Sequence, residues 1–342
     1  MSTKHETPAK KDVQIINVWK KNLRDEFGKI NKIVEEYPFV AMDTEFPGVV
    51  ATPVGQFKSK EDFNYQLVSC NVNMLKLIQV GLTFMNSSGH LPPENPVWQF
   101  NFEFNLEDDM YSTESVELLR KCGIDFPMHE DNGISMLEFG ELLTTSGLLT
   151  DPKIHWLTFS SGYDFGYLMK AVLTRELPKE EKDFFKKLQT LFPSSIDIKL
   201  MLRQPGPLAV KLRGGLQEVA SMLQVTRYGM QHQAGSDSLL TGNTFFAIKE
   251  KFFSLSWDEL FENIRGELYG LGNTLSCDTP KLNSSQIRST PLPYNTNYTE
   301  SPAIGSDKTS KSNSPESQGK IVQTLTITNP DTNGTICPIL AE

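Results

Sequence analysis

The sequence predicts a mixed α/β domain in which helices cover both faces of one sheet. Three short apolar runs with strand-like composition lie in the first third of the chain, and helical spacing dominates from about residue 165 onward. Strands that come first, with helices behind them, are typical of a sheet packed between helices. Hydrophobic residues make up 38% of the 342 residues, which is enough for a sizeable core.

The elements are expected in a definite order. Apolar residues recur at helical intervals between residues 12 and 37, which predicts an opening amphipathic helix. Residues 39–42 (Phe-Val-Ala-Met) have the composition of a short buried strand. The later predictions are strands over 75–85, 97–104 and 154–159, and helices over 115–121, 134–143, 165–173, 179–191, 216–223 and 236–253.

The composition changes after about residue 275. Ser, Thr, Asn and Pro dominate there, and such a mixture buries too little apolar surface to offset the entropy lost on ordering. We therefore expect a folded domain over 12–274 and a disordered tail over 275–342. Residues 321–327 alternate like a strand, so docking of this piece is an alternative, although composition favours an unstructured stretch.

Charge and cysteine content limit the function classes. A formal net charge of −9 argues against a broad basic surface for nucleic acid, but bound cations could hold phosphates instead. The four cysteines lie far apart, which favours reduced thiols in an intracellular protein over a zinc site. No stretch approaches the roughly 18 apolar residues of a membrane span, and the first residues lack a signal-peptide core, so we expect no membrane association.

Two carboxylates follow the strand predicted over 39–42. Asp43 and Glu45 flank Thr44, so strand alternation should point both carboxylates to one side. Neighbouring carboxylates repel each other unless a cation neutralises them, and hard divalent ions such as Mg²⁺ prefer oxygen ligands. Taken alone, an Asp-x-Glu pair at a strand end is more often a solvated turn.

A third carboxylate, Asp164, lies where the strand predicted over 154–159 passes into the next helix. Considered singly, it is better explained as a helix cap or as a charge stabilised by the helix dipole. Strand-to-helix junctions are nevertheless the places where open α/β sheets collect functional groups. Whether Asp164 is a functional residue therefore depends on which other candidate residues the chain contains.

His232 and Asp237 stand at the start of the last predicted helix. Each could be structural on its own, the histidine in a loop and the aspartate as a cap. The order of the motifs changes this estimate. Asp-x-Glu, a distant Asp after a strand, and His-x-Ala-x-x-Asp opening the last helix resemble the signature of DEDD exonucleases that carry a histidine.

Within that superfamily the chain resembles the Caf/Pop deadenylases from about residue 12 to residue 272. The matching blocks are residues 42–50, 98–102, 161–168, 214–220 and 231–242. One departure is Ser160, which stands where many members carry His, and another is a tail longer than that of the compact animal forms.

The resemblance implies an RNase H-like sheet and a poly(A)-specific 3′-to-5′ exoribonuclease that releases AMP. It implies two divalent metal ions, with Mg²⁺ expected first and Mn²⁺ or Zn²⁺ as alternatives. The partners it implies are poly(A) RNA, the large Not scaffold and the nuclease–phosphatase-type deadenylase of the Ccr–Not complex, and the location is the cytoplasm and nucleus.

The family arrangement also implies a role for each site residue. Asp43 is expected to bridge both ions, with Glu45 and Asp237 on the nucleophile-side ion and Asp164 on the other. His232 is expected beside the attacking water, where an imidazole can act as general base.

Two other functions remain open. A DEDD nuclease for DNA or structured RNA would carry the same metal site, although the family blocks disfavour it. A catalytically inactive adaptor of the deadenylation machinery is the alternative outside the enzyme class. The presence of all four carboxylates and of His232 favours activity.

Overall fold

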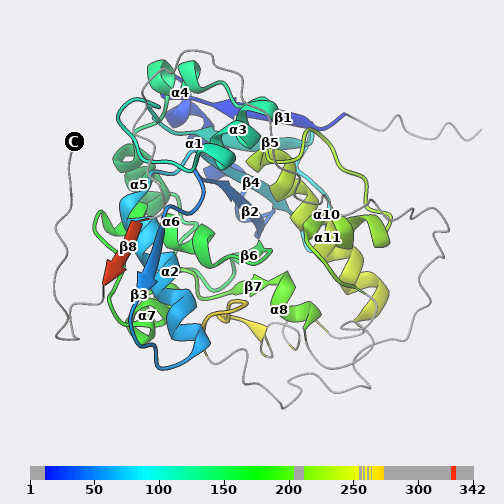
Figure 1. Cartoon of the computed structure of the whole chain (residues 1–342). Helices are drawn as coiled ribbons and strands as arrows, with labels where there is room; N and C mark the ends of the chain where they lie inside the picture. The colour runs from blue at the N-terminus through cyan, green and yellow to red at the C-terminus, as the bar shows by residue number, and fades with distance from the viewer. Residues whose placement is uncertain are drawn as a thin grey trace, which may run out of the picture.

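A six-stranded mixed sheet forms the centre of the molecule (Figure 1). The computed structural model describes residues 12–203, 212–253, 256, 259, 262, 264–272 and 325–328. The strands, in spatial order, are β1 (Gln14–Val18), β5 (Pro96–Asn101), β4 (Gln79–Met85), β2 (Phe39–Glu45), β6 (His155–Thr158) and β7 (Ser195–Asp197). β4 runs antiparallel to both of its neighbours, and the other pairs are parallel. The predicted mixed α/β class is confirmed.

Helices cover both faces of this sheet, as Figure 1 shows. On one face lie α1 (Leu23–Ile33), α2 (Lys60–Met74), α5 (Met136–Thr145), α6 (Gly162–Leu173) and α7 (Glu181–Leu191). On the other face lie α8 (Ile198–Leu202), α10 (Leu216–Met222) and α11 (Ala234–Phe252). Two short helices, α3 (Thr113–Lys121) and α4 (Phe126–Asn132), pack on a smaller apolar cluster.

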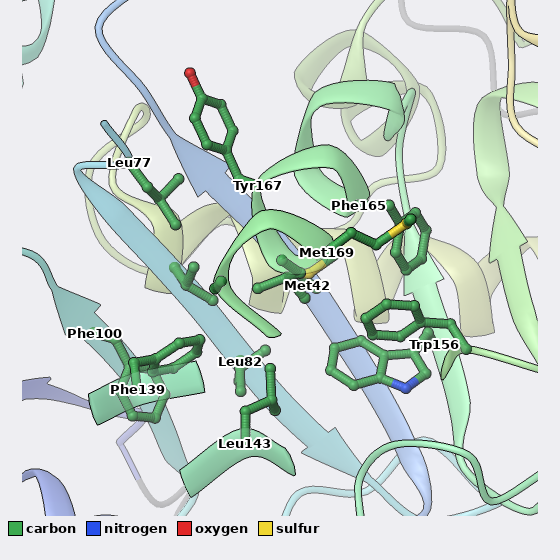
Figure 2. Packing of buried hydrophobic residues seen from close by; sticks show 14 of the residues in the cluster. Met42, Leu77, Leu82, Phe100, Phe139, Leu143, Trp156, Phe165, Tyr167 and Met169 are labelled. Atoms are coloured by element: carbon green, nitrogen blue, oxygen red, sulfur yellow. The ribbon is translucent and has the colours of Figure 1, made fainter. Parts of the chain in front are cut away.

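The alternation of strand side chains divides the core into two parts. Val40 and Met42 of β2 join the larger part, beneath α5 and α6, where aromatic side chains such as Trp156 and Phe165 fill the space (Figure 2). Phe39 and Ala41 point the other way and pack in the part that α11 covers. The same alternation places Asp43 and Glu45 on the α11 side of the sheet.

The parallel pairing of β2 with β6 sets the position of the candidate site. Because the two strands run in the same direction, their carboxyl ends meet at one edge of the sheet. β2 ends there with Glu45, and the chain leaving β6 enters α6 a few residues later. α11 begins over the same edge, where its first residues lie against β4 and β5.

The structure corrects the start of the chain. The helix predicted over 12–37 is wrong for Gln14–Val18, which forms the edge strand β1 and pairs with β5. Ile15, Ile16 and Val18 are β-branched, and five residues are too few to separate the two periods. Only Leu23–Ile33 of that segment is α-helical.

The other predicted strands and helices are present, with ends shifted by a few residues, but some elements were not predicted. These are β3 (Ala51–Val54), α2, α4, β7 and α8. The sequence shows no helical period of apolar residues over α2, because the buried residues of this helix include the polar Ser69 and Asn71. β7, α4 and α8 are only three to seven residues long. None of the helices in the described part of the chain combines the length and apolar character needed to cross a bilayer.

Most of the predicted tail lies outside the described residues. Leu325–Thr328 is the exception, since it forms strand β8 and pairs in parallel with β3. For these four residues the expectation of an unstructured chain is wrong. The alternative prediction, that this piece docks on the domain, is what the structure shows. Cys70 and Cys122 are free thiols, whereas Cys277 and Cys337 are not among the described residues.

Candidate metal centre

Four carboxylates from three elements meet at the carboxyl end of β2. Asp43 and Glu45 come from β2 itself, Asp164 from the first turn of α6, and Asp237 from the first turn of α11. The charges of Asp164 and Asp237 both raise the pKa values of Asp43 and Glu45, which places Asp164 and Asp237 within electrostatic reach of the two β2 carboxylates. The structure therefore brings together the four carboxylates that the sequence singled out.

Asp164 is held by β2, and the turn that precedes its helix is held by Asp197. The Thr44 hydroxyl donates a hydrogen bond of 2.7 Å to Asp164 Oδ1. The turn itself contains Ser160 in the left-handed region (φ 65°), and the backbone N–H groups of Ser160 and Ser161 donate to the buried Asp197 carboxylate at 2.9 and 3.1 Å. Asp197 thus compensates the unusual backbone at Ser160 and sets where α6 begins.

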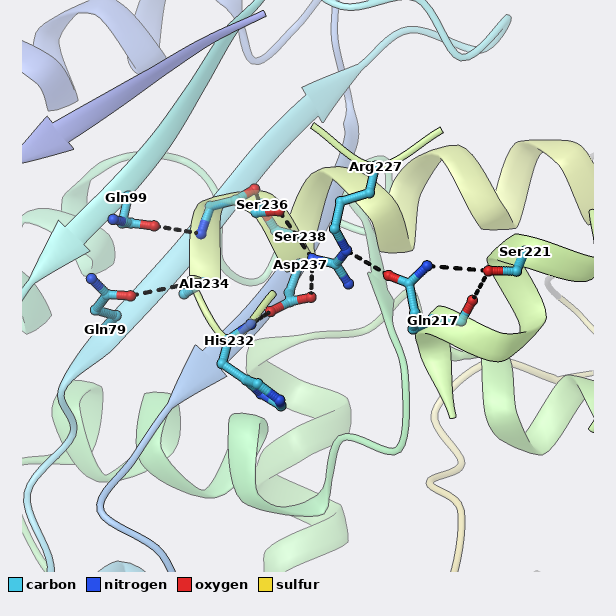
Figure 3. A network of polar contacts seen from close by, with 11 residues as sticks. Gln79, Gln99, Gln217, Ser221, Arg227, His232, Ala234, Ser236, Asp237 and Ser238 are labelled. Atoms are coloured by element: carbon cyan, nitrogen blue, oxygen red, sulfur yellow. Dashed lines mark hydrogen bonds and ion pairs between the residues drawn. The ribbon is translucent and has the colours of Figure 1, made fainter. Parts of the chain in front are cut away.

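Asp237 holds the loop that carries His232 (Figure 3). The backbone N–H of His232, itself in the left-handed region (φ 59°), donates to Asp237 Oδ2 at 2.9 Å. The ring of His232 offers a nitrogen that lies within 4.8 Å of carboxylate oxygens of Glu45 and Asp237. His232 is therefore beside the carboxylate cluster, in reach of a water or an ion held there.

Two amide side chains of the sheet cap the start of α11. Gln79 Oε1 accepts a hydrogen bond from the backbone N–H of Ala234 at 3.2 Å, and Gln99 Oε1 accepts one from Gly235 at 3.0 Å. Gly81 permits this contact, because a Cβ there would lie 1.8 Å from the carbonyl oxygen of Ala234. These bonds satisfy N–H groups that have no partner within the helix and fix the turn that carries Asp237.

The electrostatics of the cluster favour a bound cation. Burial is the largest cause that raises the pKa values of Asp43 and Glu45, and the neighbouring carboxylates raise them further. Burial also raises the pKa of Asp164 to about 6, although the hydrogen bond from Thr44 acts in the opposite direction. Ionised carboxylates this close need a counter-charge, and an all-oxygen set suits Mg²⁺ or Mn²⁺. The residues thus fit a divalent metal centre.

The five candidate residues lie together, but several of their supports were not predicted. Thr44, Asp197 and Arg227 gave no signal in the sequence. Gln99 lies in the block at 98–102 that resembles the family, and its contact with α11 gives this residue of the block a structural role. Phe46, next to the carboxylates, stacks on Tyr163 with ring centroids 4.8 Å apart and packs against the larger core.

The fold and the carboxylate cluster are those of a metal-dependent hydrolase. Comparison with known proteins identifies the family within this class. Residues 18–141 match the model of the CAF1 family ribonuclease. CCR4-NOT transcription complex subunit 7 of Caenorhabditis elegans is 60% identical over 265 residues, which are 78% of this chain and 86% of the relative. Poly(A) ribonuclease pop2 of Schizosaccharomyces pombe is 48% identical over 260 residues, 76% of each chain. The chain belongs to the CAF1 family of ribonucleases.

Solved structures agree with this assignment. S. pombe Pop2p in its Mg²⁺- and Mn²⁺-bound form matches with a TM-score of 0.71 and 48% identity, over 75% of this chain and 99% of that one. A structure of the yeast NOT1 MIF4G domain co-crystallized with CAF1 matches with a TM-score of 0.62 and 30% identity, over 77% and 100% of the two chains. The RNase H-like fold and the metal-dependent nuclease class, both implied by the resemblance, are confirmed.

Proposed function

We propose that this protein shortens the poly(A) tails of mRNA from the 3′ end and releases AMP, as a catalytic subunit of the Ccr–Not complex. The observation that carries this proposal is the meeting of Asp43, Glu45, Asp164 and Asp237 with His232 at one sheet edge. The choice of poly(A) is supported by the S. pombe relative, which is named a poly(A) ribonuclease. An inactive adaptor is disfavoured because the full set of carboxylates is retained.

Each residue has a proposed task. When two divalent ions are bound, Asp43 would be a ligand of both, Glu45 and Asp237 would hold the ion on the side of the attacking water, and Asp164 would hold the other. Two such ions, when bound, would activate water, neutralise charge on the phosphate and assist the leaving 3′-oxygen. Thr44 keeps Asp164 oriented through its hydrogen bond of 2.7 Å. Mg²⁺ is the proposed ion, with Mn²⁺ or Zn²⁺ as alternatives.

His232 is proposed to accept the proton of the attacking water. Its ring nitrogen lies within 4.8 Å of carboxylate oxygens of Glu45 and Asp237, so one water can contact both the ring and the site. The hydrogen bond from its backbone to Asp237 fixes the loop, which lowers the cost of holding the ring in place. The same geometry would also let His232 act as a ligand, and the two roles differ in their response to metal.

The proposed partners are the large Not scaffold and the nuclease–phosphatase-type deadenylase, and the proposed location is the cytoplasm and nucleus. The scaffold is supported by the structural match to a complex of the yeast NOT1 MIF4G domain with CAF1. The C. elegans relative, named as a subunit of the CCR4-NOT complex, supports the same assembly.

The function is tested by following the products formed from a 5′-labelled RNA that ends in twenty adenosines. With Mg²⁺, the full-length protein should shorten the tail one nucleotide at a time and release AMP, and EDTA should stop the reaction. Matched substrates ending in uridines, and a single-stranded DNA, should be degraded more slowly. Internal cleavage, or equal rates on RNA and DNA, would exclude the proposed poly(A) exoribonuclease.

We propose that residues 12–274 are the nuclease domain and residues 275–342 a tail that catalysis does not need. All six strands of the central sheet and all five site residues lie before residue 274, and β8 pairs with β3 rather than with that sheet. Truncation after Leu275 should therefore leave poly(A) shortening at the rate of the full chain, measured in parallel. A truncated protein that is insoluble, or that has no cooperative unfolding transition, would show that the boundary is misplaced.

A further inference from the structure

Asp237 has a cationic neighbour that the sequence did not reveal. Arg227 lies in the loop between α10 and α11, and its Nη1 is 2.6 Å from Asp237 Oδ1. The Arg227 side chain is 14% exposed and the Asp237 side chain 9%, so the pair is largely shielded from water. Such a pair keeps one geometry far better than an exposed ion pair does.

Arg227 is itself held by two further acceptors (Figure 3). Its Nε donates to Gln217 Oε1 at 2.6 Å, and its Nη1 donates to Ser236 Oγ at 3.0 Å. Gln217 belongs to α10, and its amide nitrogen donates to Ser221 one turn further along that helix at 3.2 Å. A planar guanidinium with acceptors on two helices has little freedom to move.

The two oxygens of Asp237 are thus each engaged by one donor. Oδ1 faces Arg227, and Oδ2 accepts the backbone N–H of His232 at 2.9 Å. A carboxylate oxygen has two lone pairs, so each oxygen can still bind a cation. The two donors fix the rotation of the carboxylate and therefore where those remaining lone pairs point.

We propose that Arg227 is a positioning residue that orients the carboxylate of Asp237 toward the metal centre, and that Gln217 of α10 holds Arg227 in place. The inference rests on the proposed function, in which Asp237 is a metal ligand. It gives a role to Gln217, which lies in the matching block at residues 214–220. The alternative is that Arg227 contributes only its positive charge.

Arg227→Lys and Gln217→Leu separate orientation from charge. Lysine keeps the charge but cannot donate to Gln217, Ser236 and Asp237 in one fixed plane. The Gln217 change removes the acceptor and touches no proposed ligand. Two quantities are measured on the full chain: Mn²⁺ affinity by calorimetry without RNA, and the Mg²⁺ concentration that gives half the maximal rate of AMP release. The exposed Arg175→Lys is the matched control.

Orientation predicts that Arg227→Lys weakens Mn²⁺ binding and raises the half-saturating Mg²⁺ concentration by about 10- to 100-fold, the usual effect of losing a partner of a metal ligand. Gln217→Leu should shift both measured quantities in the same direction by a smaller factor. Saturating Mg²⁺ should restore most of kcat in both variants, and Arg175→Lys should match wild type.

Wild-type metal affinity in Arg227→Lys would overturn the positioning role of Arg227, and wild-type values of both quantities in Gln217→Leu would show that Gln217 does not hold Arg227. If Asp237→Ala itself binds Mn²⁺ normally, the proposed function fails instead.

Discussion

Asp43→Ala should lower the rate of AMP release from poly(A) about a thousandfold or more. Asp43 is the ligand proposed to be shared by both ions, so its loss disturbs both at once. Stabilisation of the transition-state charge by metal ions is worth several kcal/mol, and each 1.4 kcal/mol is about tenfold in rate. The rate is measured on adenosine-tailed RNA with Mg²⁺, and the exposed Asp108→Ala serves as the matched control. Undiminished AMP release by the Asp43 variant would refute the site assignment.

The same variant should remain folded. Burial and neighbouring charges raise the pKa of Asp43, so its ionised form opposes folding when no metal is bound. The stability that this group contributes is present at low pH and is lost as the pH rises through its raised folded-state pKa. In EDTA at neutral pH, Asp43→Ala should therefore unfold at a temperature no lower than wild type. Asp237→Ala is a poorer test, because it leaves Arg227 without its carboxylate.

His232→Ala should lower turnover by a factor on the order of a hundred to ten thousand, the usual contribution of a positioned acid or base. Mn²⁺ affinity should stay near that of wild type, because the four carboxylates remain. Excess Mg²⁺ should not restore the rate. The dependence of the rate on pH should be flatter in the variant, because the proposed base is absent.

A change at a proposed metal ligand should have a different effect from the His232 change. Asp164→Asn replaces a charged ligand of the proposed second ion with a neutral one, so it should raise the Mg²⁺ concentration needed for half the maximal rate. If His232→Ala behaves in that way, with its rate rescued by Mg²⁺ and its pH profile unchanged, then His232 positions an ion or the RNA. A ring nitrogen of His232 lies within 4.8 Å of carboxylate oxygens of Glu45 and Asp237, so a role in holding an ion is the main alternative to the general-base role.

The site was predictable because its residues stand beside local signals. Asp43 and Glu45 follow an apolar run, and Asp164 and Asp237 each fall at the start of a helical pattern. Their order along the chain distinguishes them from ordinary turn and cap residues. In the fold, parallel pairing of β2 with β6 brings Asp164 to the edge that carries Asp43 and Glu45, and contacts with β4 and β5 bring the start of α11 there. Sequence alone could therefore single out the candidate ligands without knowing the register of the sheet.

The supports were not predictable for the opposite reason. Asp197 accepts hydrogen bonds from the turn at Ser160, which lies 37 residues away, and Gln99 caps a helix that begins more than 130 residues later. In the sequence Arg227 cannot be distinguished from a solvated loop residue, because its partners on α10 and α11 come together only in the folded structure. Such contacts depend on tertiary structure and leave no period in the sequence.

The most direct test of this account is anomalous scattering from Mn²⁺ in crystals of the protein. We expect two peaks about 3.5 to 4 Å apart, the separation of two-metal sites, with Asp43 contacting both and Glu45, Asp164 and Asp237 completing the set. Peaks elsewhere on the molecule, or none among these four carboxylates at saturating Mn²⁺, would contradict the proposal that they form the catalytic metal centre.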